Sequence, residues 1–237
     1  MEISPLVSII IPTRNRPLFT KEAIESIEAQ TFRDYEIIVV EDAGENVSVA
    51  RNFGVSQSSG KYIAFLDSDD LWHKRKLEKQ LKYLKEHPEF KICYTNERWE
   101  RNGQHLNQLK KHQKYHGWIF DKCLPLCIIS ASSIIMERGV FDELGGFDED
   151  LVVCEDYDLW LRMALKYPIA FLDEKLIVKR GGHADQLSKK YWGMDRFRIQ
   201  SLEKILDLRL SEHQKEQVKA ELKRKKEIFS AGARKRE

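Results

Sequence analysis

The chain has 237 residues, enough for one large domain or two small ones. It carries 40 Lys and Arg against 38 Asp and Glu, and this net charge of only +2 excludes the strongly basic footprint of a nucleic-acid-binding protein. No apolar stretch approaches the roughly 20 residues of a membrane span, and no signal-peptide pattern follows Met1. We therefore expect a globular cytoplasmic protein.

The charge is concentrated at one end. Residues 211–237 hold nine Lys or Arg and five Asp or Glu, a local net charge of +4 on a body of −2. A basic helix gains free energy near anionic lipid, so one hypothesis is peripheral, salt-sensitive contact with the cytoplasmic face of a membrane. The alternative is a helix that packs on the domain or mediates a homodimer.

The four cysteines form no C-x-x-C pair, and no matching His or Cys pair follows the closest two of them. Such isolated cysteines are typical of reduced core residues. We expect this environment for Cys93, Cys123, Cys127 and Cys154.

The first 95 residues alternate between two patterns. Short apolar runs rich in β-branched residues predict buried strands at 6–11, 35–40, 62–66 and 90–95. Apolar residues at helical spacing predict helices after Pro17, over 47–56, and around Leu77, Leu81 and Leu84. This alternation predicts an α/β fold with a mostly parallel central sheet.

The second half is less regular. A loop or hairpin is expected over 99–113, and a long strand or strand pair over 128–136. Further expectations are a short helix over 140–148, a buried helix over 155–166, a strand over 169–178, a loop over 180–183, and helices over 195–210 and 212–229. We divide the chain into a main domain, 1–194, and a basic helical extension, 195–237. Within the main domain we separate a first half, 1–98, from a second half, 99–194.

Three of the predicted strands end in polar turns, at 13–16, at 41–42 and at 67–70. Parallel α/β sheets bind ligands where strands end at their carboxyl edge. Asp67, Asp69 and Asp70 stand closest together, and alternation along a strand places Asp67 and Asp69 on one side. Like charges this close repel, so the cluster indicates a hard cation such as Mg²⁺ or Mn²⁺.

Two other interpretations of this cluster are weaker. Helix N-capping explains one or two of the aspartates but not three after a buried strand. An EF-hand loop would place its twelfth ligand at Glu78, but Leu71 and Trp72 stand where a ligand and the obligatory glycine should be.

Other candidates each have a structural alternative. Asp42 could accept hydrogen bonds from a ribose or base, or simply form a turn before Gly44. Arg51 could reach a phosphate or lie solvated on the surface. Asp156, beside Glu155 at the start of a buried helix, could be a general base or could interact only with the helix dipole.

Asp158 and Arg162, four residues apart on the same helix, are interpreted as a structural pair. His183 in a Gly-Gly-His-Ala-Asp stretch could complete a metal site or act as a substrate-loop residue without metal.

Five segments in order resemble family 2 glycosyltransferases with the GT-A fold. They are Val7–Arg16, Val39–Asp42, Ala50–Gly54, Gly60–Asp70 and Glu155–Arg162. The resemblance covers roughly residues 5 to 185. It implies a nucleotide-diphospho-sugar donor, a UDP-sugar by expectation, and transfer of the sugar with inversion to a glycan or lipid-linked acceptor in polysaccharide biosynthesis.

The resemblance implies that 1–194 is the catalytic domain, with a nucleotide-sugar-binding half over about 1–98 and an acceptor-binding half over 99–194. It also implies roles for individual residues. Asp69 with Asp67, and less securely His183, would bind the divalent metal ion, and Asp156 with Glu155 beside it would supply the general base. The nucleotide-sugar would contact Pro12, Thr13, Arg14, Asn15, Asp42, Arg51, Asn52, Asp67 and Ser68.

The chain departs from the family pattern in two places. Only seven residues, 43–49, separate Asp42 from the Ala-Arg-Asn motif, which shortens the wall of the nucleotide pocket. The Gln-x-x-Arg-Trp signature of processive synthases is absent, because Gln186 is followed by Leu-Ser-Lys, so transfer of a single sugar is expected. A nucleotidyltransferase and a non-catalytic sugar-nucleotide-binding protein are the alternatives. The first would carry a glycine-rich loop after the first strand, and the second would show a decayed site.

Overall fold

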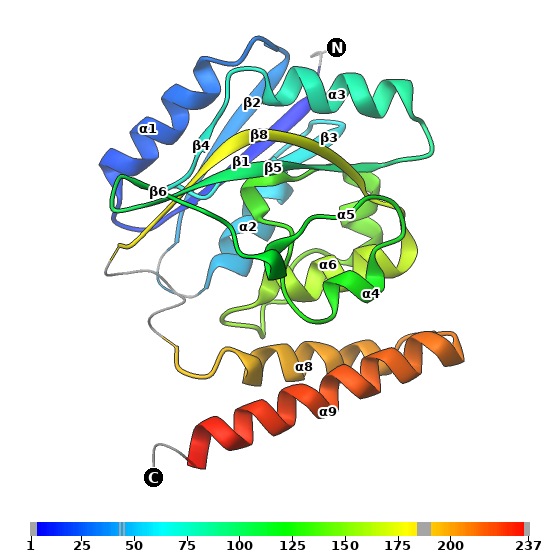
Figure 1. Cartoon of the computed structure of the whole chain (residues 1–237). Coiled ribbons are helices and arrows are strands. Elements are labelled where there is room, and N and C mark those ends of the chain that lie inside the picture. The colour runs from blue at the N-terminus through cyan, green and yellow to red at the C-terminus, as the bar shows by residue number, and fades with distance from the viewer. Residues whose placement is uncertain (1–3, 43, 45, 184–190, 235–237) are drawn as a thin grey trace.

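A computed structural model describes residues 4–42, 44, 46–183 and 191–234. A curled sheet is covered by α1 and α3 on one face and by α2, α5 and α6 on the other (Figure 1). The helices are α1 (Pro17–Glu28), α2 (Val47–Ser56), α3 (Lys76–Glu86), α4 (Phe120–Cys123), α5 (Arg138–Leu144), α6 (Glu155–Lys166), α8 (Asp195–Leu206) and α9 (Glu212–Arg234).

In the described part of the chain the sheet has eight strands in the order β2-β1-β3-β7-β5-β8-β4, with β6 paired to β5. β1, β2, β3, β5 and β8 run in one direction, and the antiparallel β7 lies between β3 and β5. The mostly parallel sheet is confirmed. The strands are β1 (Val7–Thr13), β2 (Tyr35–Glu41), β3 (Tyr62–Phe65), β4 (Leu71–Trp72), β5 (Ile92–Arg101), β6 (Gln104–Leu106), β7 (Ile135–Glu137) and β8 (Ala170–Gly181).

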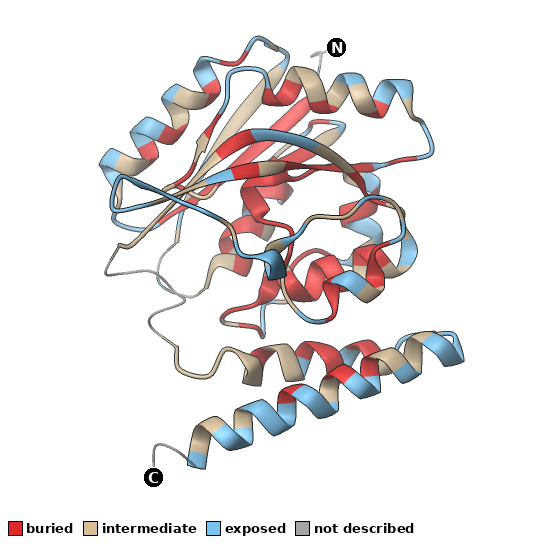
Figure 2. Ribbon diagram, viewed as in Figure 1, coloured by how far each residue is buried: buried red, intermediate tan, exposed pale blue. Residues whose placement is uncertain are grey.

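Strand alternation divides the core into two clusters. Val7, Ile9 and Ile11 of β1 face α1 and α3, whereas Ile10 faces α2. Figure 2 shows that burial is densest along the central strands and the helices beneath them. The strands and the helices predicted from the periodicity of the first half are therefore confirmed.

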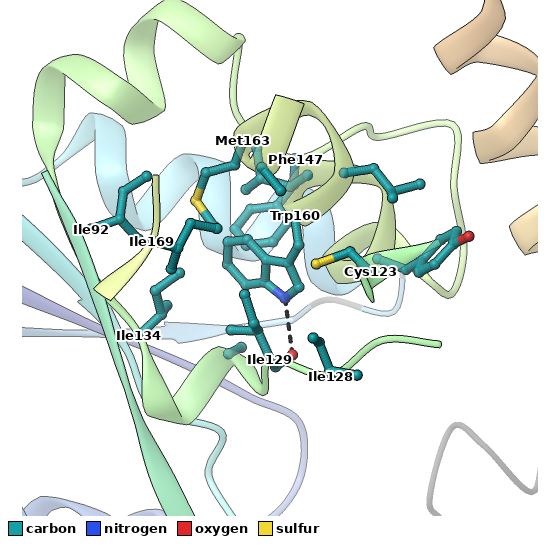
Figure 3. Close-up of a cluster of buried hydrophobic side chains, with 14 of the residues drawn as sticks. Ile92, Cys123, Ile128, Ile129, Ile134, Phe147, Trp160, Met163 and Ile169 are labelled. Carbon is teal, nitrogen blue, oxygen red and sulfur yellow. Dashed lines mark hydrogen bonds between the residues drawn. The ribbon is translucent and has the colours of Figure 1, made fainter. Parts of the chain in front are cut away.

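The core of the second half is built around α6, whose burial is confirmed. Trp160 is enclosed by Phe147, Met163, Ile129 and Ile134, and its indole N–H donates to the Ile129 carbonyl at 3.1 Å (Figure 3). A buried indole needs such a partner, so this bond ties α6 to the chain before β7.

The predicted strand over 128–136 is wrong. A 3₁₀ turn, η2 (Ala131–Ser133), replaces most of it, and β7 keeps only three residues. The serines explain the difference, because the Ser133 hydroxyl donates to the Ser130 carbonyl and the Ser132 hydroxyl bonds to Asp70. The predicted loop at 180–183 is wrong in part, since Arg180 and Gly181 extend β8 against β5.

The two C-terminal helices, α8 and α9, lie side by side below α6 (Figure 1). Leu202 and Ile205 of α8 and Val218 of α9 join the same core cluster as Trp160. Lys225, one of the nine basic residues counted over 211–237, is buried and donates to the Pro125 carbonyl and to Asp195. The division of the chain at residue 194 stays a prediction. None of the described helices is both long and apolar enough to cross a membrane.

One lysine lies inside the core beneath the sheet edge. The Lys76 ammonium donates to Gln80 at 2.8 Å and sits 3.9 Å from the centroid of the Trp72 ring. Burial lowers the pKa of Lys76 to about 7. In the unfolded chain this lysine keeps its proton up to a pKa near 10.5.

We therefore predict that the free energy of unfolding rises with pH between about 7 and 10.5, because the unfolded state binds the extra proton. The slope from this residue is at most about 1.4 kcal/mol per pH unit. Lys76→Met should remove that slope in urea unfolding at pH 7.0 and 9.5, whereas Lys82→Met on the exposed face of α3 should retain it. An unchanged slope in Lys76→Met would contradict the prediction.

Candidate active site

The polar turns after β1, β2 and β3 meet at one edge of the sheet. The backbone N–H of Asp42 donates to the Thr13 carbonyl at 2.7 Å. Arg16 donates to Asp69 at 2.8 Å, and the N–H of Asn15 donates to Glu41 at 2.9 Å. The convergence predicted from the sequence is present.

The turn after β1 is held in a strained conformation. Asn15 has a φ of 52°, in the left-handed region that Asn tolerates better than most residues. Pro12 and Thr13 are buried, whereas Arg14 and Asn15 are exposed at the edge. The buried pair thus anchors the loop, and Arg14 and Asn15 are available to a ligand.

Glu41, the last residue of β2, and Asp42, which follows it, make different contacts in the turns. Glu41, which the sequence did not single out, fixes Asn15 by accepting its N–H. Asp42 accepts the N–H of Gly44 at 2.8 Å, which is the turn arrangement considered from the sequence. The Arg14 guanidinium lies against Gly44, where an added β-carbon would come within 3.1 Å of it.

Asp67, Asp69 and Asp70 lie in a turn, because β3 already ends at Phe65. Strand alternation therefore does not set their directions, and that part of the prediction is wrong. Asp67 pairs with Arg51 at 2.7 Å, and Asp69 pairs with Arg16 at 2.8 Å. Asp70 accepts the Ser132 hydroxyl and the N–H of Arg180. Ser68 between them is buried.

The carboxylates nevertheless act on one another. Burial, with the charge of Asp67 added to it, raises the pKa of Asp69, and Arg16 opposes this shift. Burial and the same Asp67 charge raise the pKa of Asp70 well above its usual range. This crowding of negative charge is what a bound cation would relieve.

The donor chemistry at this turn suits a hard divalent ion. Arg51 engages one oxygen of Asp67 and Arg16 one oxygen of Asp69, and each carboxylate has a second oxygen. Mg²⁺ typically takes one or two protein carboxylates and fills its other positions with phosphate and water. Among the described residues, no three His, Cys, Asp or Glu side chains are grouped as a complete metal site.

His183 is not brought into such a group. Its ring packs edge-on against Phe19 at a centroid distance of 4.6 Å. The Arg180 guanidinium lies 5.0 Å from the centre of the Phe19 ring, and Arg180 donates to the Asp69 carbonyl. His183 therefore lies one residue layer away from the aspartate turn.

Arg51 is the central buried cation of the site. It is 4% exposed, and its two terminal nitrogens donate to Asp67 at 2.7 Å and Glu155 at 2.6 Å. Burial opposes its charge, but these two carboxylates raise the pKa of Arg51 above its ordinary value. Arg51 thus joins two parts of the site and is not the solvated surface residue considered from the sequence. Its contact with a phosphate stays a prediction.

Asn52, the next residue of α2, also links two distant segments by hydrogen bonds. Its side chain donates to the Phe147 carbonyl and to Glu149 and accepts the N–H of Phe147. Its polar atoms are thus used to hold the chain before α6.

Glu155 and Asp156 face opposite surroundings at the start of α6. Glu155 is buried against Arg51, and burial together with the Asp156 charge raises the pKa of Glu155. Asp156 lines a cleft of about 450 Å³, bounded by β5, β8, the segment after β6 and residues 126–130. Asp156 is therefore positioned to meet a molecule in the cleft, and Glu155 is not.

Cys127 departs from the core environment predicted for the cysteines. All four lie in the described part of the chain and are free, but Cys127 is half-buried and lines the cleft. Its Sγ lies 3.3 Å from Asp156 Oδ2. Burial and the Asp156 charge raise the pKa of the Cys127 thiol, so it remains a hydrogen-bond donor to the carboxylate.

The sequence did not reveal the cation at the floor of the cleft, Lys179 of β8. Burial opposes its charge, but Glu97, Asp70, Asp67 and Asp156 together raise the pKa of Lys179. Lys179 lines the cleft together with Asp156. Only the pairing of β5 with β8 places it there, so no local sequence pattern could have indicated it.

Glu97 of β5 is the second residue that the sequence missed. It accepts from Ser130 at 2.6 Å, Trp99 at 2.8 Å and Lys114 at 3.1 Å. Burial works against ionisation, yet Lys179 and Lys114 hold the pKa of Glu97 down to about 2. It lies beyond the strand predicted over 90–95, because β5 continues to Arg101.

Asp158 and Arg162, interpreted as a structural pair, are confirmed at 2.7 Å. Arg162 also donates to the carbonyls of Leu144 and Gly146, which ties α6 to the end of α5.

The mostly parallel sheet and its carboxylate-rich strand edge are typical of α/β enzymes that bind ligands at the carboxyl ends of their strands. The family "Glycosyltransferase like family 2" matches residues 9–205, which is most of the chain. The chain belongs to this family, and its fold is the GT-A fold that the motifs implied.

Curated relatives agree with this assignment. An uncharacterised glycosyltransferase of Rickettsia felis is 32% identical over 215 residues, covering 78% of this chain and 36% of the relative. The Escherichia coli protein named UDP-Glc:alpha-D-GlcNAc-diphosphoundecaprenol beta-1,3-glucosyltransferase WfgD is 28% identical, covering 66% of this chain and 68% of its own. The chain spans about a third of the length of the Rickettsia relatives that it matches first.

Solved structures share the fold at low sequence identity. S. aureus TarS 1–349 in complex with UDP-GlcNAc aligns with a TM-score of 0.75 and 20% identity, covering 92% of this chain and 72% of that one. The mannosyltransferase PcManGT from Pyrobaculum calidifontis, in complex with GDP-Man and Mn²⁺, aligns with a TM-score of 0.66 and 16% identity, covering 93% and 70%.

The Arg51 bridge generates a prediction about stability. Arg51→Met leaves Glu155 buried without its cation and should lower the free energy of unfolding by about 3–5 kcal/mol. Glu155→Gln should lower the free energy of unfolding less in the Arg51→Met background than in the unmodified chain. In that background the cation is already absent, and Glu155→Gln removes the carboxylate charge that was left unpaired.

Urea unfolding of the four proteins in this cycle gives the coupling, which we expect to exceed about 1 kcal/mol. The exposed Arg98–Glu100 pair supplies the control, since Arg98→Met should change stability by less than about 0.5 kcal/mol. Additive effects of the Arg51 and Glu155 changes would show that the bridge carries no special stability.

Proposed function

We propose that this chain is an inverting, metal-dependent glycosyltransferase that moves a single sugar from a UDP-sugar to an acceptor hydroxyl. The observation that supports this most directly is the Arg51 bridge, which bonds Asp67 of the aspartate turn at 2.7 Å and Glu155, the neighbour of Asp156, at 2.6 Å. The bridge holds carboxylates suited to a metal–diphosphate close to a carboxylate suited to a general base, and Asp156 lines the cleft. Donor binding and deprotonation of the acceptor can therefore take place side by side.

In the proposed reaction, the acceptor hydroxyl lies in the cleft beside Asp156. Its oxygen forms a bond to the anomeric carbon from one side while the bond from that carbon to the donor phosphate breaks on the other. Asp156 Oδ accepts the hydroxyl proton, and the bonding electrons leave with the nucleoside diphosphate. Attack opposite the leaving group inverts the configuration at the anomeric carbon.

The residues around Asp156 prepare it for this role. Cys127 donates to one of its oxygens, and Glu155, anchored on Arg51, fixes the first turn of α6. Glu155 is therefore a positioning residue in this proposal. Lys179 lies where it can attract the negative charge of the departing diphosphate.

The residues of the aspartate turn would hold the metal ion through Asp67 and Asp69. When bound, Mg²⁺ or Mn²⁺ would offset the charge that grows on the leaving diphosphate. Arg16, now paired with Asp69, and exposed Arg14 lie at the same edge and can contact phosphate. Asp42 and Asn15 would contact the nucleoside.

Relatives supply the proposed substrate classes. The name of the E. coli relative includes a UDP-sugar donor and a diphosphoundecaprenol-linked acceptor, and the TarS structure contains UDP-GlcNAc. We therefore propose a UDP-sugar and a lipid-linked or glycan hydroxyl, with a role in polysaccharide biosynthesis at the cytoplasmic face of a membrane. The apolar part of the cleft, Leu106, Leu126 and Ile128, suits an amphiphilic acceptor.

The donor is tested by thermal stabilisation with UDP-, GDP-, dTDP- and CMP-sugars, each with Mn²⁺ and with EDTA. A donor that binds only the folded protein raises the melting temperature. We expect the UDP-sugars to do so, and only with the metal. Metal-dependent hydrolysis of the same donor then separates an enzyme from a binding protein. Release of pyrophosphate in a separate assay with a nucleoside triphosphate and a sugar 1-phosphate would instead identify a nucleotidyltransferase.

Asp69→Ala should abolish both metal-dependent donor stabilisation and transfer while the fold is kept. The reason is that Asp69 is the half-buried carboxylate whose charge a cation would compensate. Donor binding by calorimetry and transfer of radiolabelled sugar are the measurements. Full activity of the variant, or equal wild-type activity in EDTA, would rule out the metal role.

Asp156→Asn should leave donor affinity within a few fold but lower kcat by roughly 10²-fold or more, the usual scale for a lost general base. Glu155→Gln should act differently, lowering stability together with activity because Glu155 is buried against Arg51. Collapse of donor binding in Asp156→Asn with kcat preserved would show that Asp156 binds donor instead.

A further inference from the structure

Residues 101–120, which connect β5 and β6 to α4, contain no Asp or Glu. This 101–120 segment has three exposed cations, Arg101, Lys110 and Lys111. In a chain with nearly equal numbers of acidic and basic residues, an acid-free run of this length creates a local positive surface.

The segment is anchored to the sheet on its inner side. Gln108 donates to the Glu97 carbonyl, the Tyr115 N–H donates to the Tyr94 hydroxyl, and Lys114 is buried against Glu97. In Figure 1 it is the green connection that runs below the sheet from β6 to α4. Its backbone course is therefore set by contacts along β5.

Within the 101–120 segment, the 3₁₀ turn η1 (Lys110–His112) has one side toward the cleft and one toward solvent. His112 packs on Trp99 at a ring distance of 4.6 Å and lines the cleft. Lys110 and Lys111 are exposed, and Leu109 beside them is 61% exposed. An exposed leucine and two exposed lysines thus follow one another at this turn.

This surface borders the mouth of the cleft that contains Asp156. Arg101, Leu106 and His112 line the cleft, and Leu106 is still 43% exposed. Leu106, Leu109, Lys110 and Lys111 therefore form an amphipathic rim, which we call the cleft rim. Exposed leucines beside two lysines, in a segment that itself contains no Asp or Glu, match a surface that is both apolar and anionic.

Helix α9, the basic region noticed in the sequence, matches such a surface less well. Its exposed Lys219 and Lys223 alternate with exposed Glu212, Glu216 and Glu227. Lys226 pairs with Glu203. These acids lower the local positive potential of α9.

We propose that the cleft rim docks on an anionic lipid bilayer, so that the mouth of the cleft opens toward the membrane surface. The inference rests on the proposed function in one respect, that the acceptor is carried by a lipid. The two lysines supply attraction to anionic headgroups, and Leu109 with Leu106 enters the boundary between headgroups and acyl chains. A soluble anionic partner would attract the lysines but would not bury Leu106 and Leu109.

The test is sedimentation with vesicles of phosphatidylcholine containing 30% phosphatidylglycerol, compared with pure phosphatidylcholine. We expect binding only to the anionic vesicles, and loss of binding in 0.5 M salt, where the Debye length falls to roughly 4 Å. Lys110→Glu/Lys111→Glu should weaken binding at least tenfold, and Leu109→Ser should weaken it several fold. The matched controls on α9, Lys219→Glu/Lys223→Glu and Ile228→Ser, should bind like the unmodified chain.

Loss of binding in the α9 controls with full binding in the rim variants would overturn the proposal and assign the membrane contact to the basic tail. Absence of binding to anionic vesicles, or equal binding to neutral ones, would also overturn it. Circular dichroism checks that each variant is folded. Metal-dependent donor hydrolysis should be unchanged in Lys110→Glu/Lys111→Glu. Failure of the glycosyltransferase proposal is distinguished from failure of the docking proposal, because it would appear as absent hydrolysis in the unmodified chain, whatever the result with vesicles.

Discussion

The arrangement of the site depends on the ion bridge made by Arg51. One buried guanidinium bonds Asp67 in the turn after β3 and Glu155 at the start of α6. Neither carboxylate can move away without leaving a charge uncompensated in a low-dielectric interior. Because Asp69 and Asp156 follow closely in the chain, the same bridge fixes the turn proposed to hold metal relative to the proposed base.

Around this bridge the site is a network of alternating charges. Lys179 faces carboxylates from three elements, and Lys114 and Lys179 keep Glu97 ionised although it is buried. Such a network is stable only when each member keeps its partners, and in return it keeps the groups in fixed orientations. A donor diphosphate entering with its metal ion would meet charges that are already placed, which limits the reorganisation needed during reaction.

Much of the first half was predictable because its structure is local. The apolar runs and helical spacing correctly placed β1, α1, β2, α2, β3 and α3. The motifs likewise indicated the family and the fold. The prediction over 128–136 was wrong because serine hydroxyls bond to nearby backbone and to Asp70, and this competes with strand pairing. The alternation argument for Asp67 and Asp69 was wrong because β3 ends two residues before Asp67.

The sequence by itself determined the class of fold, the family and the three strand ends where polar residues gather, since these follow from periodicity and short motifs. Only the tertiary structure decided how the charges pair. Arg51 and Lys225 look like surface cations in the sequence, yet each is buried against carboxylates distant in the chain. Lys179 reaches the cleft through the pairing of β5 with β8. The physical reason is that an ion pair depends on distance and burial, and both are set by contacts between residues that lie far apart in the sequence.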